Sequence, residues 1–470
     1  MTAVNPTRRL RLALLSLVGV VVAGVTVTLL VRRELAARRL AAVIAEIDRT
    51  DPGWRCADLE CVRPTVPDAE NFAIAFAAAY PKFSKPKDRA VRELWNPVVA
   101  LKDELVPNVR LTTEQESMLR RHFATNAAAA PAFLALADYP RGRFPLVPAA
   151  DGVSFELDHV NRMRPASTGT LVPLAFLAVH DGDIATALAV FRARLAFARS
   201  LRDEPMSASQ SVRAQFQREA VNGLQRLLGH LELSADQLAR IRRELTVELA
   251  DDPWVLVTRD QRAVSDAFLM ALRTGTVKLS TAKANMIPDY KPTPAERLSD
   301  WVQDHVSVDV DAAHTVKLEV ATRLVATARR PWPERVAAAD ALDAELAASS
   351  VPLNWMMRGA AGRMARFLLA VRARVSTAVA AAAVEQHRVE RGDWPTALPA
   401  GLPDDPYTGK PLLYRPLADG VVVYSVGPNG RDDGGTLTPE ATDVNPPPDG
   451  DIGFRLWDVP HRNCKPGGEP

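Results

Sequence analysis

Residues 366–392 read RFLLAVRARVSTAVAAAAVEQHRVERG, an alanine- and valine-rich run whose only glycine is its last residue. Alanine has the highest helix propensity, and glycine is common just past the end of a helix. The run therefore predicts one long helix that Gly392 closes.

The residues after this helix predict a small β structure. Strands are expected over 412–417 and 421–426, with a hairpin turn at Asp419-Gly420 between them. A lone hairpin is only marginally stable in water. We therefore expect this one to pack on the helix before it, which makes the C-terminal part a small α+β unit.

The composition divides the chain near the same place. The 470 residues carry a formal charge of +2, but from Asp393 onward 12 acidic residues face 6 basic ones, a net of −6, so residues 1–392 carry +8. The C-terminal stretch also holds 14 of the 36 prolines. The near-neutral total argues against a nucleic-acid partner, and three cysteines exclude a small scaffold built on disulfides.

An N-terminal membrane anchor is expected over residues 12–31, which are 20 residues without a charge. As a helix this run rises about 30 Å, the thickness of a bilayer core. A cleaved signal peptide is the alternative, but the run exceeds the usual apolar region and lacks a clear cleavage site. Arginines flank it on both sides, at Arg8, Arg9, Arg11, Arg32, Arg33, Arg38 and Arg39.

The orientation of the body depends on two opposing signals. Arginine counts slightly favour a body that faces the cytoplasm. Cys56 and Cys61 favour an exported body, because two cysteines five residues apart can form a short-loop disulfide in an oxidising compartment. Two unrelated thiols or a zinc site are the alternatives. We expect a single-pass protein of the cell membrane with an exported body.

Between the anchor and residue 360 the pattern is helical. Apolar residues recur from Ile184 to Leu201 at spacings of three and four, behind the cap residue Asp183. A second helix is predicted over 209–228 and closed by Gly229. Prolines between the helices mark an irregular bundle or array.

Two capping boxes mark further helix starts, in LTTEQESMLRR (111–121) and LSADQLARIRR (233–243). In each, a hydroxyl residue, Thr112 or Ser234, precedes a glutamine by three positions. The likeness of the two segments indicates either a duplicated helical unit or two helices that independently obey the same capping rules.

Catalytic signatures are missing from the sequence. Phosphate-binding loops and the common zinc-protease and hydrolase motifs do not occur. His305 and His314 stand among acidic residues, where we expect a solvated connection rather than a metal site. Four tryptophans among charged helical residues are expected to be core anchors: Trp95, Trp301, Trp332 and Trp355.

From the long helix onward the sequence resembles the globular part of type II secretion pseudopilins, especially the major pseudopilin. The family motifs are an aromatic-Pro step after the helix, an Asp-Pro-x-x-Gly-x-Pro turn, a Tyr-Ser-x-Gly strand end and an acidic glycine-rich loop. The matching positions are Gly392, Trp394, Pro395, Leu398, Asp405, Pro406, Gly409, Pro411, Tyr414, Tyr424, Ser425, Gly427, Asp451, Ile452 and Trp457.

In pseudopilins the acidic loop can hold calcium, an ion that takes six to eight oxygen ligands. The resemblance therefore implies a calcium site here, with carboxylates from Asp432, Asp433, Asp449 and Asp451. A solvated acidic turn is the alternative. The chain departs from the family at its N-terminus, where the pilin processing site is missing, so it is not expected to polymerise as a pilin subunit.

The whole chain also resembles uncharacterised bacterial membrane-anchored helical proteins, through DRTDPGWR (48–55) and VPDAENF (66–72). We therefore expect a mainly α chain: an anchor at 1–33, an α-helical domain at 34–360, a pseudopilin-like helix and β unit at 361–458, and a flexible tail at 459–470.

The expected function is that of a single-pass, non-enzymatic scaffold or interaction protein of the cell envelope, with other envelope proteins as partners. One alternative is an anchored hydrolase with carboxylates contributed by separate helices. The other is an accessory component of a type II secretion-like system.

Overall fold

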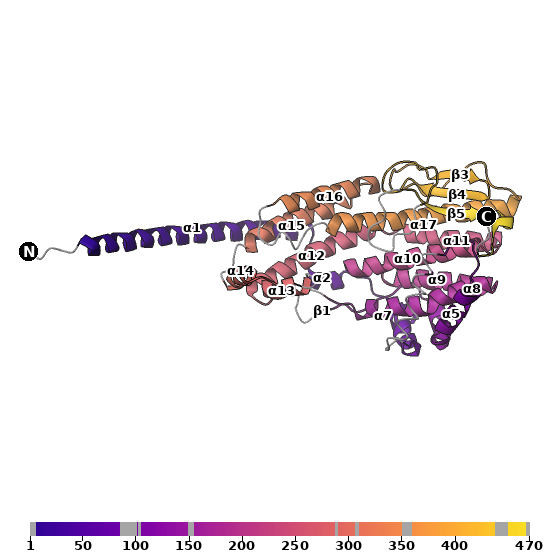
Figure 1. Ribbon diagram of the computed structural model, residues 1–470, viewed down its shortest axis with the longest axis horizontal. Coiled ribbons are helices and arrows are strands. Elements are labelled where there is room, and N and C mark those ends of the chain that lie inside the picture. The colour runs from indigo at the N-terminus through magenta and orange to yellow at the C-terminus, as the bar shows by residue number, and fades with distance from the viewer. Residues whose placement is uncertain are drawn as a thin grey trace, which may run out of the picture.

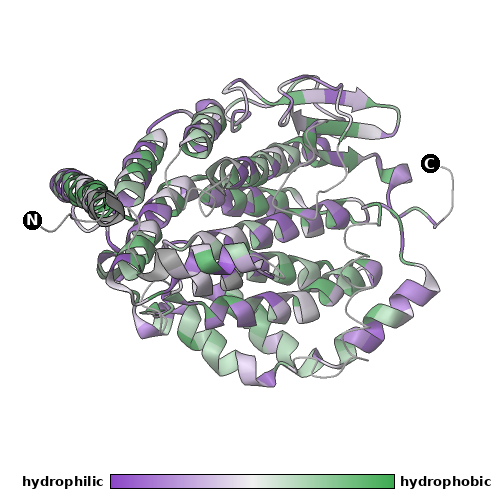
Figure 2. Cartoon of the chain, turned by 60° about the vertical axis from the view of Figure 1, so that its left-hand side comes forward, coloured by the Kyte–Doolittle hydropathy of each residue, from purple (hydrophilic) through white to green (hydrophobic). Residues whose placement is uncertain are grey.

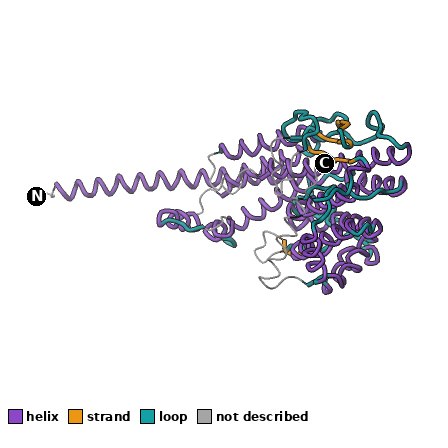
Figure 3. Tube along the Cα trace, turned by 45° about the vertical axis from the view of Figure 1, so that its right-hand side comes forward, coloured by secondary structure: helices purple, strands orange, loops and turns teal. Residues whose placement is uncertain are grey.

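The computed structural model describes residues 6–84, 101, 105–148, 155–286, 290–305, 310–349, 360–437 and 450–466. The body is a stack of helices that run along one long axis, with a small sheet at one end (Figure 1). The N-terminal helix α1 leaves the body at the opposite end and projects far beyond it (Figures 1 and 3).

The prediction of a mainly helical chain with an N-terminal apolar helix and a small sheet is confirmed. The α-helices of the described residues are α1 (Pro6–Thr50), α2 (Cys56–Cys61), α3 (Phe72–Ala79), α5 (Thr113–Ala124), α6 (Ala130–Ala135), α7 (Asp158–Ala166), α8 (Val172–His180), α9 (Ile184–Ser200), α10 (Ser207–Leu228), α11 (Ala235–Leu249), α12 (Pro253–Thr274), α13 (Leu279–Met286), α14 (Pro294–His305), α15 (Val310–Thr327), α16 (Trp332–Ala348) and α17 (Ala360–Arg391). The strands are β1 (Val147–Pro148), β2 (Phe155–Glu156), β3 (Leu413–Leu417), β4 (Gly420–Ser425) and β5 (Ile452–Trp457).

The helix α1 has an exposed half and a docked half. Every residue from 14 to 35 is exposed, including the apolar ones, and this part is long and apolar enough to span a membrane. Further along, Leu40 and Ile47 are buried against Leu318 of α15. Near the helix end Asp51 pairs with Arg259 of α12 at 2.9 Å. The exposed apolar half and the body are therefore joined by one uninterrupted helix of 45 residues.

The long helix α17 lies at the centre of the body. Its alanines at 380–383 are almost fully buried, and their small side chains let neighbouring elements approach closely. The core around α17 includes residues of α9, α10 and α11 on one side and of β4 and β5 on the other. Although α17 is also apolar enough to cross a membrane, 89% of its apolar window is buried, so it is a core helix.

The other helices carry polar and apolar residues side by side along their length (Figure 2). This is the pattern of amphipathic helices that pack in layers and keep a polar face in solvent. Both predicted capping boxes are formed, at the start of α5 with Thr112 and Gln115, and at the start of α11 with Ser234 and Gln237. The two helices differ in length after these caps, since α5 has 12 residues and α11 has 15.

The C-terminal sheet has three antiparallel strands in the order β3-β4-β5. The predicted hairpin is formed by β3 and β4, with Leu417 opposite Gly420. Gly420 has a φ of 147° and a Cβ there would meet the backbone of Leu456 at 2.1 Å, so only glycine fits the position. All six residues of β4 are buried, because the strand lies between β3 and β5 and over α17.

Hydrogen bonds hold residues 459–466 against the body, whereas the sequence predicts a flexible tail over 459–470. The buried guanidinium of Arg462 donates to Glu385 of α17 at 2.8 Å. Cys464 pairs with the 108–110 segment through its backbone N–H, which donates to the Asn108 carbonyl at 2.8 Å. These bonds fix the segment across the end of the body, since a buried guanidinium needs its carboxylate partner. Residues 467–470 lie outside the described residues.

Candidate functional site

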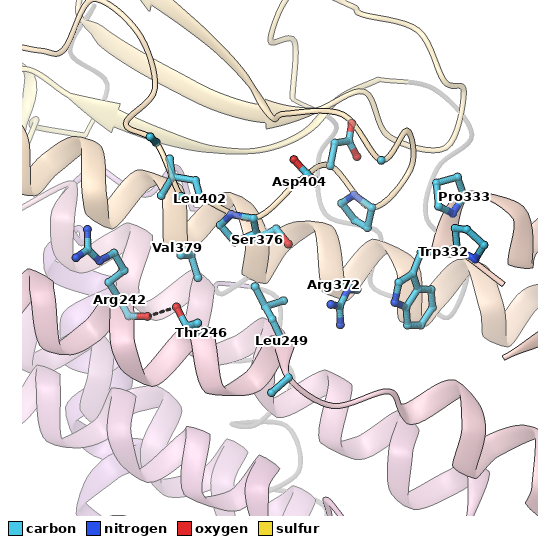
Figure 4. A pocket seen from close by; sticks show the side chains of 18 residues that line it. Arg242, Thr246, Leu249, Trp332, Pro333, Arg372, Ser376, Val379, Leu402 and Asp404 are labelled. Carbon is cyan, nitrogen blue, oxygen red and sulfur yellow. Dashed lines mark hydrogen bonds between the residues drawn. The ribbon is translucent and has the colours of Figure 1, made fainter. Parts of the chain in front are cut away.

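An open groove of about 810 Å³ separates the C-terminal unit from the helices beneath it (Figure 4). Its floor is formed by α11 and α17, which contribute Arg242 and Thr246, and Arg372 and Ser376, respectively. Its far wall is the loop of residues 400–409. Trp332, at the first turn of α16, closes one end between two prolines.

The loop wall is held in place by Asp405. This carboxylate is buried, and it accepts hydrogen bonds from the Ser425 hydroxyl at 2.7 Å and from the backbone N–H groups of Tyr407 at 2.8 Å and Val426 at 3.1 Å. Its acceptors are used within the fold, so it is not available to act on a ligand. Its neighbour Asp404 is exposed and faces the groove.

Arg372 is the most distinctive cation of the groove. Within the described residues its one hydrogen bond to protein is long, 3.3 Å from Nη1 to the Asp251 carbonyl. Its guanidinium carbon also lies 5.5 Å from the ring centre of Trp332. Burial lowers the pKa of Arg372, which is the direction expected for a buried cation whose charge is not fully balanced by nearby carboxylates.

The carboxylates nearest to Arg372 already have partners. Asp251 pairs with Arg213 at 2.6 Å and with Arg202, and Asp252 pairs with Arg335 at 2.6 Å. The guanidinium of Arg335 stacks on Trp332 at 4.2 Å. These contacts fix the Trp332 ring beside Arg372, which lines the groove.

A buried ionic network lies below the groove floor. Glu248 of α11 accepts from Arg199 at 2.6 Å and from Gln217 at 2.8 Å, which connects it to α9 and α10. A small cavity between Arg213, Glu248 and Arg372 joins this network to the groove. Both carboxylate oxygens of Glu248 therefore have a donor, and removal of one partner from such a buried pair is strongly destabilising.

Two histidines pair with carboxylates of the body away from the groove. His159 contacts the buried Glu204 at 2.9 Å, and His314 contacts Asp266 at 2.8 Å. His314 is fully buried, so the solvated connection that we expected around it is wrong: α15 places this residue in the core against α12. The side chain of His305 lies outside the described residues.

The groove presents charged, hydroxyl and apolar side chains to a ligand. Its lining contains Asp404 and Asp405 beside arginine, hydroxyl, tryptophan and proline side chains, and no histidine or cysteine. Because the carboxylate of Asp405 is used within the fold, Asp404 is the acidic side chain of the lining that is exposed to a ligand. Among the described residues, no group of three or more His, Cys, Asp or Glu side chains is arranged to hold a metal ion.

The described residues of the expected calcium site hold hydrogen bonds of their own. Asp451 accepts from the Gly435 N–H at 2.8 Å, and burial raises its pKa. Asp432 accepts from Tyr424 at 3.0 Å, and Asp433 accepts from Asn429 at 2.7 Å. Asp449 lies outside the described residues. The calcium site stays a prediction.

Cys56 and Cys61 stand at the two ends of α2, and both are free thiols in the structure. Five residues of helix separate two Cα atoms by about 7.5 Å along the axis alone, beyond the usual span of a disulfide. Cys56 is a protonated thiol at neutral pH, because burial raises its pKa to about 12. The predicted disulfide would therefore require α2 to unwind.

The sequence alone did not reveal this groove. Its residues come from four segments spread between 242 and 409, and each segment has a structural explanation of its own. Trp332 was expected to be a core anchor, but it is half-buried at the groove end. The signal that was available is Pro331-Trp332-Pro333, where two prolines hold an aromatic ring at the start of a helix.

Comparison of this chain with protein-family models, with curated proteins and with solved structures finds no match.

Proposed function

We propose that this protein is a single-pass, non-enzymatic interaction protein of the cell envelope, whose groove binds an extended segment of a partner protein. The observation that carries the proposal is the position of Arg372: it points into the groove beside a fixed Trp332 ring and has no carboxylate partner among the described residues. An acidic side chain of the partner would pair with this guanidinium.

The rest of the groove fits the same kind of ligand. Trp332 and the prolines around it offer an apolar surface with little conformational freedom, which suits aliphatic or proline side chains of an extended peptide. Arg242 on the groove floor and the exposed Asp404 on the loop wall provide one charge of each sign. A polypeptide can satisfy both signs along its length, whereas a simple anion would meet the repulsion of Asp404.

The structure of α1 supports the membrane-anchored part of the proposal. Its apolar residues are exposed from Leu14 to Leu35, whereas its later turns belong to the core of the body through Leu40 and Ile47. A helix that is shared in this way ties the protein to the bilayer through a rigid connection.

The pseudopilin-like part of the proposal concerns α17 and the sheet. It is supported by the three antiparallel strands that pack on a long helix. It is also supported by the hydrogen bond between Asp405 and Ser425, which joins two of the residues that carry the resemblance. We infer that partners of this protein belong to a secretion-like assembly of the envelope, for which the groove beside this unit is the docking site.

Photocrosslinking in living cells tests the groove. A photoreactive amino acid is placed at Thr246, which lines the groove, or at Val247, which is also exposed on α11 but outside it. We expect a discrete crosslinked partner from position 246 and none from position 247.

A charge reversal then tests the role of the arginine. Arg372→Glu should abolish the crosslink at position 246, whereas Arg366→Glu, on the same helix but paired with Asp340 outside the groove, should retain it. Equal crosslinking from both probe positions, or a crosslink that survives Arg372→Glu in a folded protein, would contradict the proposal.

A further inference from the structure

We propose that α13 and α14 form a membrane-contacting hairpin that inserts Leu298 and Trp301 into the headgroup layer of the bilayer spanned by α1. This inference goes beyond the groove and rests on the proposed anchoring by α1. The occupant of this face is the lipid surface itself.

The position of the hairpin is the first reason. In two views, α13 and α14 lie at the end of the body from which α1 emerges (Figures 1 and 3). The predicted membrane run ends at residue 31, and the first fully buried residue of α1 is Leu40. Nine residues of helix rise about 13 Å, and the headgroup layer is about 6 Å thick on each side. The remaining gap is smaller than the diameter of one helix, so a hairpin at this end reaches the lipid.

The exposed face of α14 is the second reason. Leu298 is 64% exposed, more than any other large apolar residue outside α1 in the described part of the chain, and Trp301 is 57% exposed. Residues three apart share a helix face. Trp301 was expected to be a core anchor, and its exposure shows that this expectation is wrong. Tryptophan at a membrane–water interface places its apolar ring among lipids while its N–H stays hydrated.

The opposite side of α14 is fixed to the rest of the hairpin. Asp300 is buried, and it pairs with Lys283 of α13 and accepts from the Tyr290 hydroxyl at 2.9 Å. Since Asp300 lies about 200° around the helix from Leu298, these contacts hold the apolar face outward.

Charges around the hairpin complement an anionic membrane. Within the described residues 278–301, Lys278, Lys291 and Arg297 are exposed, against one exposed acid, Glu296. Each basic side chain close to an anionic leaflet contributes about 1 kcal/mol of attraction. The exposed Arg32 and Arg33 of α1 extend the same positive zone just outside the membrane run.

Thiol alkylation of the full-length protein in lipid nanodiscs tests this contact. The discs contain phosphatidylcholine with phosphatidylglycerol, and the protein carries Cys56→Ser, Cys61→Ser and Cys464→Ser. One new cysteine is then introduced by Leu298→Cys or by Val247→Cys, the control at an exposed residue of α11, away from the hairpin (Figure 1). We expect a water-soluble maleimide to react at position 298 at least about tenfold more slowly than at position 247, because the lipid interface shields the thiol.

Two further variants make the outcome decisive. Trp301→Glu should release the hairpin and bring the reaction rate at position 298 close to that at position 247. Val20→Cys reports the anchor, and its thiol should be unreactive. Equal rates at 298 and 247 with an unreactive position 20 would overturn the hairpin contact alone. A reactive position 20 would instead overturn the anchoring on which both proposals depend.

Discussion

Asp405 is the residue that connects the loop wall of the groove to the sheet. Its carboxylate accepts hydrogen bonds from the hydroxyl of Ser425 and from two backbone N–H groups. All of these donors belong to buried or half-buried residues. Removal of a buried acceptor leaves its donors without partners, and each such donor costs about 1–3 kcal/mol. Its neighbour Asp404 is exposed and makes no such contact.

The pair of adjacent aspartates gives a matched test at the residue scale. Asp405→Ala should lower the free energy of unfolding by about 3 kcal/mol, whereas Asp404→Ala should change it by less than about 0.5 kcal/mol. Urea unfolding of the detergent-solubilised protein, followed by tryptophan fluorescence, measures both. Similar losses in the two variants would show that the hydrogen bonds to Asp405 do not hold the loop.

Glycines show what sequence can and cannot predict about single residues. Gly392 closes α17 with a φ of 87°, as predicted from its position after a long helical run. Gly229 was predicted to end α10 in the same left-handed conformation, but its φ is −75°. A Cβ at Gly229 would lie 3.0 Å from the Pro107 carbonyl, so this glycine allows a remote segment to cross the helix end. Such a close approach is set by tertiary structure, which local sequence does not encode.

At the scale of elements, a helix start that is capped by a side chain close in sequence was predictable. A helix start that is capped by a residue distant in sequence was not. The boxes at Thr112 and Ser234 use side chains within three residues of each other. The start of α10 uses Asp260 of α12 instead, which accepts from the backbone N–H and the hydroxyl of Ser207 at 2.8 and 2.7 Å. That cap comes from 53 residues away in sequence. The strand β5 was missed for a similar reason, since its partner β4 lies across a long loop.

The remote cap of α10 predicts a specific pH dependence. Burial raises the pKa of Asp260 to about 6 from its ordinary value of 3.8, so between these two pH values the folded state binds more protons than the unfolded state. The contribution of Asp260 to the free energy of unfolding is therefore fully present below pH 3.8, where its carboxyl is protonated in both states. This contribution is lost as the pH rises through 6, because the buried carboxyl must then ionise. A pKa difference of about two between the folded and unfolded states corresponds to a loss on the order of 3 kcal/mol.

Asp260→Asn removes the titration and keeps an acceptor for Ser207. We expect the wild-type stability, measured against that of the variant, to fall by about 3 kcal/mol between about pH 4 and about pH 6.5. Chemical unfolding at a series of pH values gives the difference. Parallel pH profiles for the two proteins would mean that Asp260 titrates at its ordinary value.

At the scale of the whole molecule, the class of the fold was predictable and the groove was not. Periodicity, capping and one apolar run were enough to predict a helical body, a small sheet and an apolar N-terminal helix, because each signal is local. The groove arises where α11, α16, α17 and the 400–409 loop meet. Arg372 in particular lies in an alanine-rich helix, where its long side chain gave no indication that it would lack a carboxylate partner.

The orientation of the molecule can be tested with a thiol that the chain already contains. Cys61 is exposed, so a protein with Cys56→Ser and Cys464→Ser presents one accessible thiol on the body. If the body is exported, as we expect, a membrane-impermeant maleimide should label it in cells whose outer layer is permeabilised but whose inner membrane is intact. A variant that also carries Cys61→Ser is the control for background. Labelling that appears only after lysis would place the body in the cytoplasm.

The continuity of α1 has a mechanical consequence. If α1 crosses the bilayer as we propose, it continues into the body without a hinge, so any tilt of the membrane segment rotates the whole body by the same angle. Transmembrane helices tilt to match the local thickness of the bilayer. The groove would then rise or fall relative to the membrane surface, and bilayer thickness would set the height at which it meets a partner.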